Sequence, residues 1–539
     1  MSSTHMPVST ANGVNLEQLI VDVQKRFKCA VSIVDNGALG SILFDDLASL
    51  PQLCRFLFWD AGCSFGGLIA EERSRHWELR YAFLAPSRGW IEVLVHLPLE
   101  DPSVPSVSGE VHAADWHERE VQDLFGIQFE KHPRLGDFVL HDQVWGEGLT
   151  PFRRSFDINR VHVNGQHRAD WRPLLVVRDP GAFAMPVGPV YEGGIGESIH
   201  FMLETVGEDV LRAVPRLFFN FRGVEKIAEG KSAHQALLLA ERFAAKSSFA
   251  HSTAFCTAIE RICGVQVPLR GQQLRVILAE LERLRHHTGA IAGICESTAL
   301  AVSAAQAAII EEQLLRASCQ FTCHRYLFGL NAPGGLRRDF TDVECKRFVT
   351  AVDRATEQLK VLEDRLSFTS SFLDRLEEAG VVDPKSARDL NLLGPVGRAS
   401  GENHDLRKEC PYGMYEHYEF EVPRETQGDG FARLRILFQE AYQSARLIRQ
   451  VTLSMETGPV CEACYPNRAG AALGWAEAPI GATLHWVRLD DGGLIERYRI
   501  ITPSFNNWMG FHVAVENFAF QDFPIILATF ALSATECDR

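Results

Sequence analysis

The chain has 539 residues, of which 46% are hydrophobic and 23% charged, and its formal net charge is −15 at pH 7. This length predicts two to four domains, and the composition is typical of a soluble globular protein rather than of a disordered chain. The acidic balance, without a clustered basic face, excludes nucleic acid as the main partner.

The N-terminal part mixes short helical and strand patterns. Asn15 precedes an apolar i, i+3, i+4 pattern, which predicts the start of a capped amphipathic helix. Apolar or alternating runs predict strands at residues 31–34, 77–83 and 90–97. We therefore expect a small α/β domain over residues 1–145.

After residue 145 the composition and the hydrophobic periodicity of the chain change twice. Residues 146–187 place arginine and histidine among proline and glycine with little periodicity, which predicts an extended linker. Helical periodicity dominates residues 233–374 and 430–456, and alternating strands return at 472–501. We therefore expect a large, mainly α-helical domain over residues 188–539, and an α+β fold class for the whole chain.

Two features bear on location. Residues 289–310 are long enough to suggest a membrane span, but they are rich in Ala and Ser and contain Glu296, which favours a buried helix of a bundle. The N-terminal residues lack a secretory pattern, and thirteen scattered cysteines fit a reducing compartment. We expect a cytoplasmic location.

Several motifs occur in an order that indicates a family. Residues 116–133 (WHEREVQDLFGIQFEKHP) resemble the signature of the 30-kilodalton-type subunit of respiratory complex I. Later motifs resemble the 49-kilodalton-type subunit and the large subunit of membrane-bound [NiFe] hydrogenases: FRGVEKIAE at 221–229, FAHST at 249–253, GVQVPLR at 264–270 and GPVGRASG at 394–401. The fusion of both types in one chain resembles the group 4, formate-hydrogenlyase type.

The metal site that this resemblance implies has lost its ligands. A [NiFe] centre is held by four cysteine thiolates, which are soft ligands, and an arginine lies over it. The four cysteine positions are occupied here by Ala244, Ser247, Ser533 and Glu536. The arginine position carries Ile480, which supplies no cation. We therefore expect no metal or other cofactor on this chain and no hydrogenase activity.

The resemblance marks Glu225, His251 and Tyr191 as pocket candidates for catalysis. Glu225 occupies the position that relays protons in hydrogenases, and a buried carboxyl group with a raised pKa could do so here. A structural role for Glu225, as a helix cap or in a salt bridge near Arg222 or Lys226, is the alternative.

A quinone is the candidate ligand that the complex I resemblance implies. The quinone-binding His and Tyr of that family are matched here by Tyr191 and Ala245. Tyr191 with His251 or His200 could donate hydrogen bonds to a quinone carbonyl, although each histidine alone is more often structural. Lys246, Ser247, His251 and Glu536 could instead converge on a harder metal or an anion. The sequence leaves these alternatives open.

Three cysteines need separate comment. Cys461 and Cys464 form a Cys-x-x-Cys pair in a predicted loop, where a packing or solvent-facing role is favoured over zinc binding or redox pairing. Cys263 lies in a stretch similar to the first hydrogenase motif, but it follows FAHST and we assign it to the next helix. We do not expect it to bind metal.

Charged residues of the matched motifs are candidates for contacts with partner subunits. We expect Arg398, Asp405 and Arg407 to tie loops against an adjoining subunit, and Glu120 and Asp123 to do the same for the N-terminal domain. Ordinary surface ion pairs are the alternative. The resemblance implies three kinds of partner: an iron–sulfur small subunit with a [4Fe-4S] cluster, a ferredoxin-like subunit and antiporter-like membrane subunits.

The sequence thus predicts a subunit of the peripheral arm of a complex-I-like or hydrogenase-related oxidoreductase at the cytoplasmic face of the inner membrane. It would pass electrons from the neighbouring [4Fe-4S] subunit to a quinone-like or unknown acceptor, coupled to ion translocation. The alternative is a non-catalytic subunit that keeps only the fold and the partner surfaces.

Overall fold

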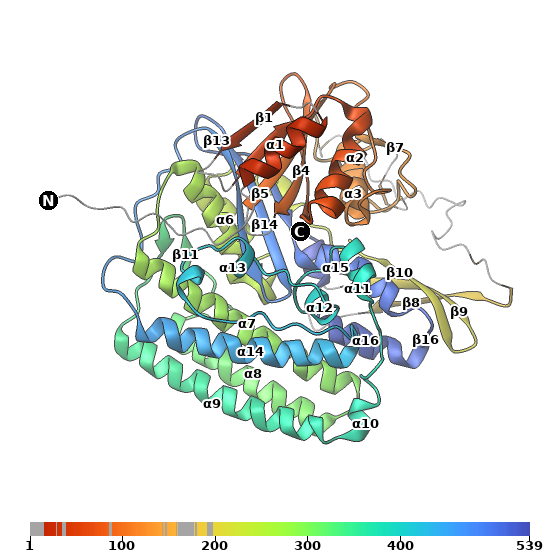
Figure 1. Cartoon of the computed structure of the whole chain (residues 1–539). Coiled ribbons are helices and arrows are strands. Elements are labelled where there is room, and N and C mark those ends of the chain that lie inside the picture. The colour runs from red at the N-terminus through yellow and green to blue at the C-terminus, as the bar shows by residue number, and fades with distance from the viewer. Residues whose placement is uncertain are drawn as a thin grey trace. The chain divides into compact units, whose positions relative to one another are not determined.

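The computed structural model describes residues 16–27, 30–34, 39–85, 89–142, 144–145, 148–157, 159, 177, 180–190 and 198–539. Contacts divide the chain into two compact units, residues 1–135 and 136–539 (Figure 1). A small mixed unit followed by a larger, mainly helical one confirms the predicted α+β fold class. The predicted boundaries at 145/146 and 187/188 stay predictions, and most of the expected linker lies outside the described residues.

The N-terminal unit is built on a five-stranded sheet. Its strand order is β1-β2-β5-β4-β3, antiparallel except for the parallel β2–β5 pair. The strands are β1 (Ala30–Val34), β2 (Leu39–Leu43), β3 (Ser64–Glu72), β4 (Trp77–Ala85) and β5 (Gly89–Leu97). The smaller elements are α1 (Leu16–Phe27), α2 (Leu50–Arg55), β6 (Ser103–Pro105), α3 (Asp115–Phe125) and β7 (Gln128–Glu130). Helix α3 ends at Phe125 and is followed by Gly126, whose φ of +74° is the left-handed conformation that glycine adopts without strain.

A helical bundle forms the core of the larger unit. Helices α7 (Leu269–Ser297), α8 (Ala301–Thr322), α9 (Asp342–Ser367) and α14 (Gly430–Leu453) lie side by side (Figure 1). Their buried apolar faces form one continuous cluster, which includes Leu281, Ile310 and Leu437.

The segment at 289–310 is not one helix, as the sequence predicted, but the end of α7 and the start of α8. Ala299 has a φ of +63° and Leu300 is non-helical, which breaks the helix after Ser297. Ile294 and Ile310 are nevertheless buried in the bundle. Among the described residues, no helix is long and apolar enough to cross a membrane.

Two sheets and several short helices complete the larger unit. One antiparallel sheet has the order β16-β10-β9-β8, and the other has the order β13-β14-β15. Their strands are β8 (Phe183–Val190), β9 (Ile199–Val206), β10 (Asp209–Arg216), β13 (Gly470–Ala478), β14 (Gly481–Leu489), β15 (Ile495–Ile501) and β16 (Phe518–Ala519). Two short strands, β11 (Asn331–Ala332) and β12 (Gly335–Leu336), form a separate hairpin. The remaining helices are α4 (Val224–Ala228), α5 (Ala233–Ala240), α6 (Ser248–Cys263), α10 (Ser370–Leu373), α11 (Pro384–Asp389), α12 (Gly394–Ala399), α13 (Leu406–Glu409), α15 (Pro503–Ala514), α16 (Phe523–Phe530) and α17 (Ala534–Cys537).

Helix α6 packs directly on the β13–β14–β15 sheet. The close approach requires a glycine, because a Cβ at Gly474 would lie 2.0 Å from the carbonyl oxygen of Ala254. This contact brings the FAHST motif at the start of α6 against β14 and the C-terminal helix α17.

Candidate functional site

A carboxylate from the bundle fixes the start of helix α6. The first backbone N–H groups of a helix have no partner inside the helix. Here Glu282 of α7 accepts from the N–H of Phe249 at 2.7 Å and of Ala250 at 3.0 Å, and from the Ser248 hydroxyl at 3.3 Å. Burial raises the pKa of Glu282 to about 7, against the lowering effect of these hydrogen bonds. Glu282 therefore fixes residues 248–250, and with them the positions of Ser247 before this segment and His251 after it.

Ser247, His251 and Glu536 meet in the interior. The Ser247 hydroxyl donates to Glu536 Oε1 at 2.6 Å, and His251 Nε2 lies 3.6 Å from the same oxygen. All three side chains are fully buried. Burial acts to raise the pKa of Glu536, but His251, Ser247 and Ser504 together lower it below its usual value. The structure thus holds Glu536 as a carboxylate inside the protein.

A series of polar groups continues from His251 into the sheet. His251 Nδ1 lies 2.9 Å from Thr483 Oγ1 and 3.0 Å from His485 Nε2, and His485 Nδ1 lies 2.6 Å from the Tyr498 hydroxyl. Burial, followed by the nearby His251 and Arg539, lowers the pKa of His485 well below its usual value. The sequence analysis missed Thr483, His485 and Tyr498. The available signal was the polar pair Thr483 and His485, two residues apart in an apolar strand and therefore on one face.

Glu225 lies in a cluster of arginines. Its carboxylate accepts from Arg497 at 3.3 Å, Arg499 at 3.2 Å, Arg539 at 3.3 Å and the backbone N–H of Ile500 at 2.9 Å. Of the two expected partners, Arg222 donates to the carbonyl groups of Thr535 and Asp538, and Lys226 pairs with Glu229. The ion-paired arrangement is therefore present, with partners that the local sequence did not indicate.

The remaining predicted pocket positions differ in environment. Ala244, Ser533 and Ile480 are buried, at 1–2% exposure, whereas Ala245 is exposed. Tyr191 lies outside the described residues. Two of the four former thiolate positions, Ser247 and Glu536, are in direct contact. Alanine offers no ligand atom, and hydroxyl and carboxylate oxygens are hard donors, so these residues do not fit the four-thiolate set of a [NiFe] centre.

The predicted contacts of Arg398, Asp405 and Arg407 with a partner subunit need correction. All three side chains are about 1% exposed and bind residues of this chain instead. Arg398 donates to Glu440 at 2.7 Å, and Arg407 donates to Glu280 at 3.0 Å and to Asp405 at 2.7 Å. The network joins α7, α12, α13 and α14, so its charges stabilise the interior of the larger unit rather than a surface.

The N-terminal interface candidates lie on α3. Glu120 is buried at 1% exposure and Asp123 is half-buried. The neighbouring Glu118 is fully buried and accepts from the Ser106 hydroxyl and from the backbone N–H of Val107. Burial raises the pKa of Glu118 to about 8, despite these hydrogen bonds. The helix thus presents part of its acidic motif to the core of its own unit.

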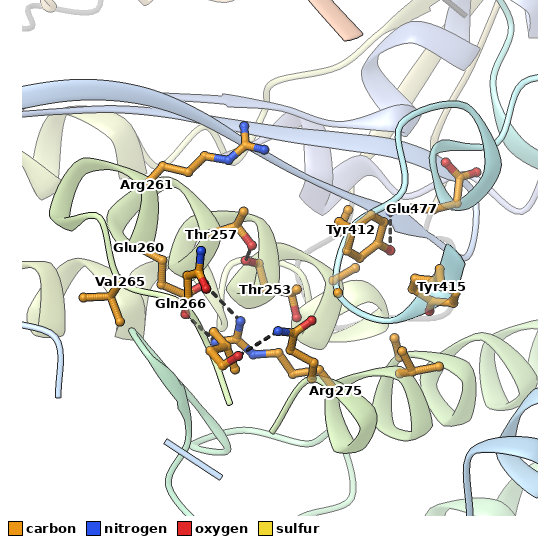
Figure 2. Close-up of a pocket in the computed structure, with 17 residues that line it drawn as sticks. Thr253, Thr257, Glu260, Arg261, Val265, Gln266, Arg275, Tyr412, Tyr415 and Glu477 are labelled. Atoms are coloured by element: carbon orange, nitrogen blue, oxygen red, sulfur yellow. Dashed lines mark hydrogen bonds and ion pairs between the residues drawn. The ribbon is translucent and has the colours of Figure 1, made fainter. Parts of the chain in front are cut away.

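A cavity of about 230 Å³ lies beside the Arg398 and Arg407 network of the larger unit, between α6, α7 and the loop at 412–413 (Figure 2). Thr253, Thr257 and Glu260 line it from α6, on the side of the helix opposite His251. Arg275 of α7 forms a two-bond ion pair with Glu260, at 2.7 and 3.1 Å. Tyr412 lies at the opposite end in Figure 2, and its hydroxyl accepts from the backbone N–H of Glu477 at 2.9 Å. Among the residues that the structure describes, no predicted site residue lines this cavity.

The three cysteines discussed above lie closer together than the sequence indicated. Cys263 is the last residue of α6, not part of the next helix, and its thiol is hydrogen-bonded to that of Cys464. Burial, with the neighbouring thiols of Cys263 and Cys461 and the charge of Glu260, raises the pKa of Cys464 to about 12. The thiols are therefore held protonated, and any metal or redox role stays a prediction.

The fold and these motifs define a subunit of a membrane-bound, complex I-like or hydrogenase-related complex. The family described as "Respiratory-chain NADH dehydrogenase, 30 Kd subunit" matches residues 46–161, and "Respiratory-chain NADH dehydrogenase, 49 Kd subunit" matches residues 306–466. Among curated proteins, formate hydrogenlyase subunit 5 of Escherichia coli is 30% identical over 491 residues, which cover 89% of this chain and 85% of the relative. Hydrogenase-4 component G of the same organism is 26% identical, over 89% of this chain and 84% of the relative.

The NADH-quinone oxidoreductase C/D subunit of Acinetobacter baumannii is 27% identical, over 83% of this chain and 82% of the relative. A chain of the solved archaeal membrane-bound sulfane sulfur reductase, a respiratory membrane complex, matches with a TM-score of 0.63 and 26% identity. That match covers 68% of this chain and all of the other. The chain therefore belongs to the family of fused 30- and 49-kilodalton-type subunits that includes formate hydrogenlyase subunit 5.

Proposed function

We propose that this chain forms the place where electrons from a neighbouring [4Fe-4S] subunit reach an acceptor other than the proton, without a [NiFe] centre. The observation that carries the proposal is the Ser247–Glu536 hydrogen bond at 2.6 Å, formed between two positions that the family motifs assign to metal-binding thiolates. With Ala244 and Ser533 at the other two, this region lacks the soft donor set for nickel. Ion translocation coupled to this reaction is part of the proposal.

A quinone-like molecule is the acceptor that we propose first, because relatives include NADH-quinone oxidoreductase subunits. Reduction of a quinone to a quinol consumes two protons as well as two electrons. The buried series Tyr498, His485 and His251 ends at Glu536 with separations of 2.6, 3.0 and 3.6 Å. Each of these groups can hold or release a proton. We assign to the series the supply of protons to the reduced acceptor.

A sulfane sulfur compound is the second candidate acceptor, since one similar structure is that of a sulfane sulfur reductase. We propose three kinds of partner for either acceptor: the iron–sulfur small subunit, a ferredoxin-like subunit and antiporter-like membrane subunits. The assembly would lie at the cytoplasmic face of the inner membrane.

A non-catalytic role is the alternative, and the burial of Ala244, Ser247, Ser533, Glu536 and Ile480 favours it because packed side chains leave little room at these positions. Variants distinguish the two. The purified complex is reduced with a low-potential donor, and turnover is measured with a quinone, a polysulfide and protons as acceptors.

We expect His251→Gln and Glu536→Gln to lower acceptor turnover at least tenfold, while the iron–sulfur EPR signals stay at wild-type intensity. The exposed His234 supplies the matched control, and His234→Gln should leave turnover unchanged. Equal turnover of all three variants would support the non-catalytic role, and hydrogen evolution would contradict both.

A further inference from the structure

Three potential metal ligands gather on one face of the N-terminal sheet. The register of β4 and β5 places Glu78 directly opposite His96. His76 ends the turn between β3 and β4, where its carbonyl accepts from the backbone N–H of Arg73 at 2.9 Å. Trp77 points the other way and is buried, as strand alternation requires. The turn and the central strands therefore bring two imidazoles and a carboxylate together.

The three side chains are already close to the arrangement of a metal site. One ligand atom from each of His76, Glu78 and His96 lies within 4.8 Å of the others. His76 Nε2 is 3.3 Å from Glu78 Oε1, and the two imidazole centroids are 4.2 Å apart. A tetrahedral zinc ion with bonds of about 2.1 Å separates its ligand atoms by about 3.4 Å, so shifts of about 1 Å would close the site. In the part of the chain that the structure describes, no other His, Cys, Asp or Glu group is this compact.

We propose that His76, Glu78 and His96 bind a zinc ion. Two imidazoles and one carboxylate are a donor set that zinc prefers. Arg80 donates to Glu78 Oε2, which leaves Oε1 turned toward His76 as the ligand atom.

The charged side chains around the three proposed ligands are of both signs. Arg73 lies 3.9 Å from Glu78 Oε1, and its Nη1 is held 3.0 Å from Glu71. Burial lowers the pKa of His96, the neighbouring His76 and Arg80 act in the same direction, and Glu78 and Asp45 oppose them.

The site keeps part of its coordination sphere open. The His76 side chain is 34% exposed, that of Glu78 is 13% exposed, and His96 is exposed, so solvent reaches the ion. With three protein ligands, a fourth position remains for water or for a ligand from outside the chain. The site lies in the N-terminal unit, so the proposal is independent of the function assigned to the Glu536 region.

Zinc binding is measured by isothermal titration of the full chain with zinc chloride, in a Cys461→Ser/Cys464→Ser background that removes the competing thiol pair. We expect one zinc ion per chain, with binding weakened at least about tenfold by His76→Ala or His96→Ala. The matched control is His112→Ala, which changes an exposed histidine of the same unit and should bind as the parent does. Circular dichroism checks that each variant is folded.

Cobalt substitution identifies the donors. The cobalt-loaded chain should show d–d absorption without a thiolate charge-transfer band, and His96→Ala should lose it. No zinc binding by the folded parent would overturn the proposal. So would zinc binding that survives both histidine substitutions, or a thiolate band in the cobalt form.

Discussion

The Glu282 carboxylate of the bundle accepts hydrogen bonds from backbone N–H groups in the first turn of α6, and its removal should destabilise the start of this helix. In Glu282→Ala the backbone N–H groups of Phe249 and Ala250 lose their acceptor in the interior, where no solvent replaces it. An unsatisfied buried donor costs about 1–3 kcal/mol, so the two together should cost about 4 kcal/mol. Glu282→Gln keeps one acceptor oxygen and should cost about half as much.

Hydrogen exchange of the full chain measures this effect directly. For Glu282→Ala we expect the amides at the start of α6 to exchange about a thousandfold faster, which corresponds to about 4 kcal/mol at about 1.4 kcal/mol per factor of ten. Glu296→Ala removes an exposed carboxylate from the same helix and should leave these amides unchanged. A change in Glu282→Ala of less than about 0.5 kcal/mol, the lower end of the net contribution of a single hydrogen bond, would refute the capping role.

Three other substitutions test the packing and charges of the two units. Glu118→Gln should remove a pH dependence of stability. Because the pKa of Glu118 is raised to about 8, the folded unit holds a proton that the unfolded chain releases above about 4.5, and wild-type stability therefore falls by up to about 1.4 kcal/mol per pH unit between these values. Thermal unfolding of both proteins at pH 5 and 8 shows the difference. Arg407→Met should destabilise the larger unit by about 3–5 kcal/mol in denaturant unfolding, because the buried carboxylates of Glu280 and Asp405 both lose their ion pair with Arg407, and a near-zero cost would contradict this. Gly474→Ala should cost about 3 kcal/mol or more in the same assay, because its methyl group would overlap the carbonyl oxygen of Ala254, and wild-type stability would show that α6 and β13 are not in close contact.

Local sequence patterns predicted the type of most elements. Apolar periodicity predicted the long helices and the strands at 77–97 and 472–501, because each of these elements buries one face. The break at Ala299 escaped prediction, since the apolar pattern continues across it and only the positive φ reveals the turn. Motif order predicted the family, which the similarity to formate hydrogenlyase subunit 5 confirms.

Local sequence patterns did not predict contacts between residues that are distant in the sequence. Ser247 and Glu536 meet across 289 residues, and motif comparison alone suggested that they share a site. The arginines that bind Glu225 come from β15 and the C-terminus, so the near neighbours Arg222 and Lys226 did not indicate them. Arg398 and Arg407 were assigned from their motifs to contacts with an adjoining subunit, whereas their carboxylate partners come from distant helices of this chain.

The most direct test of the central claim is the nickel content of the complex purified with its neighbouring subunits, measured together with EPR of its reduced form. The account predicts reducible iron–sulfur signals without nickel in this subunit, because Ala244, Ser247, Ser533 and Glu536 stand where thiolates would be needed. One nickel atom per chain would contradict it and would mean that other residues of the chain hold the metal.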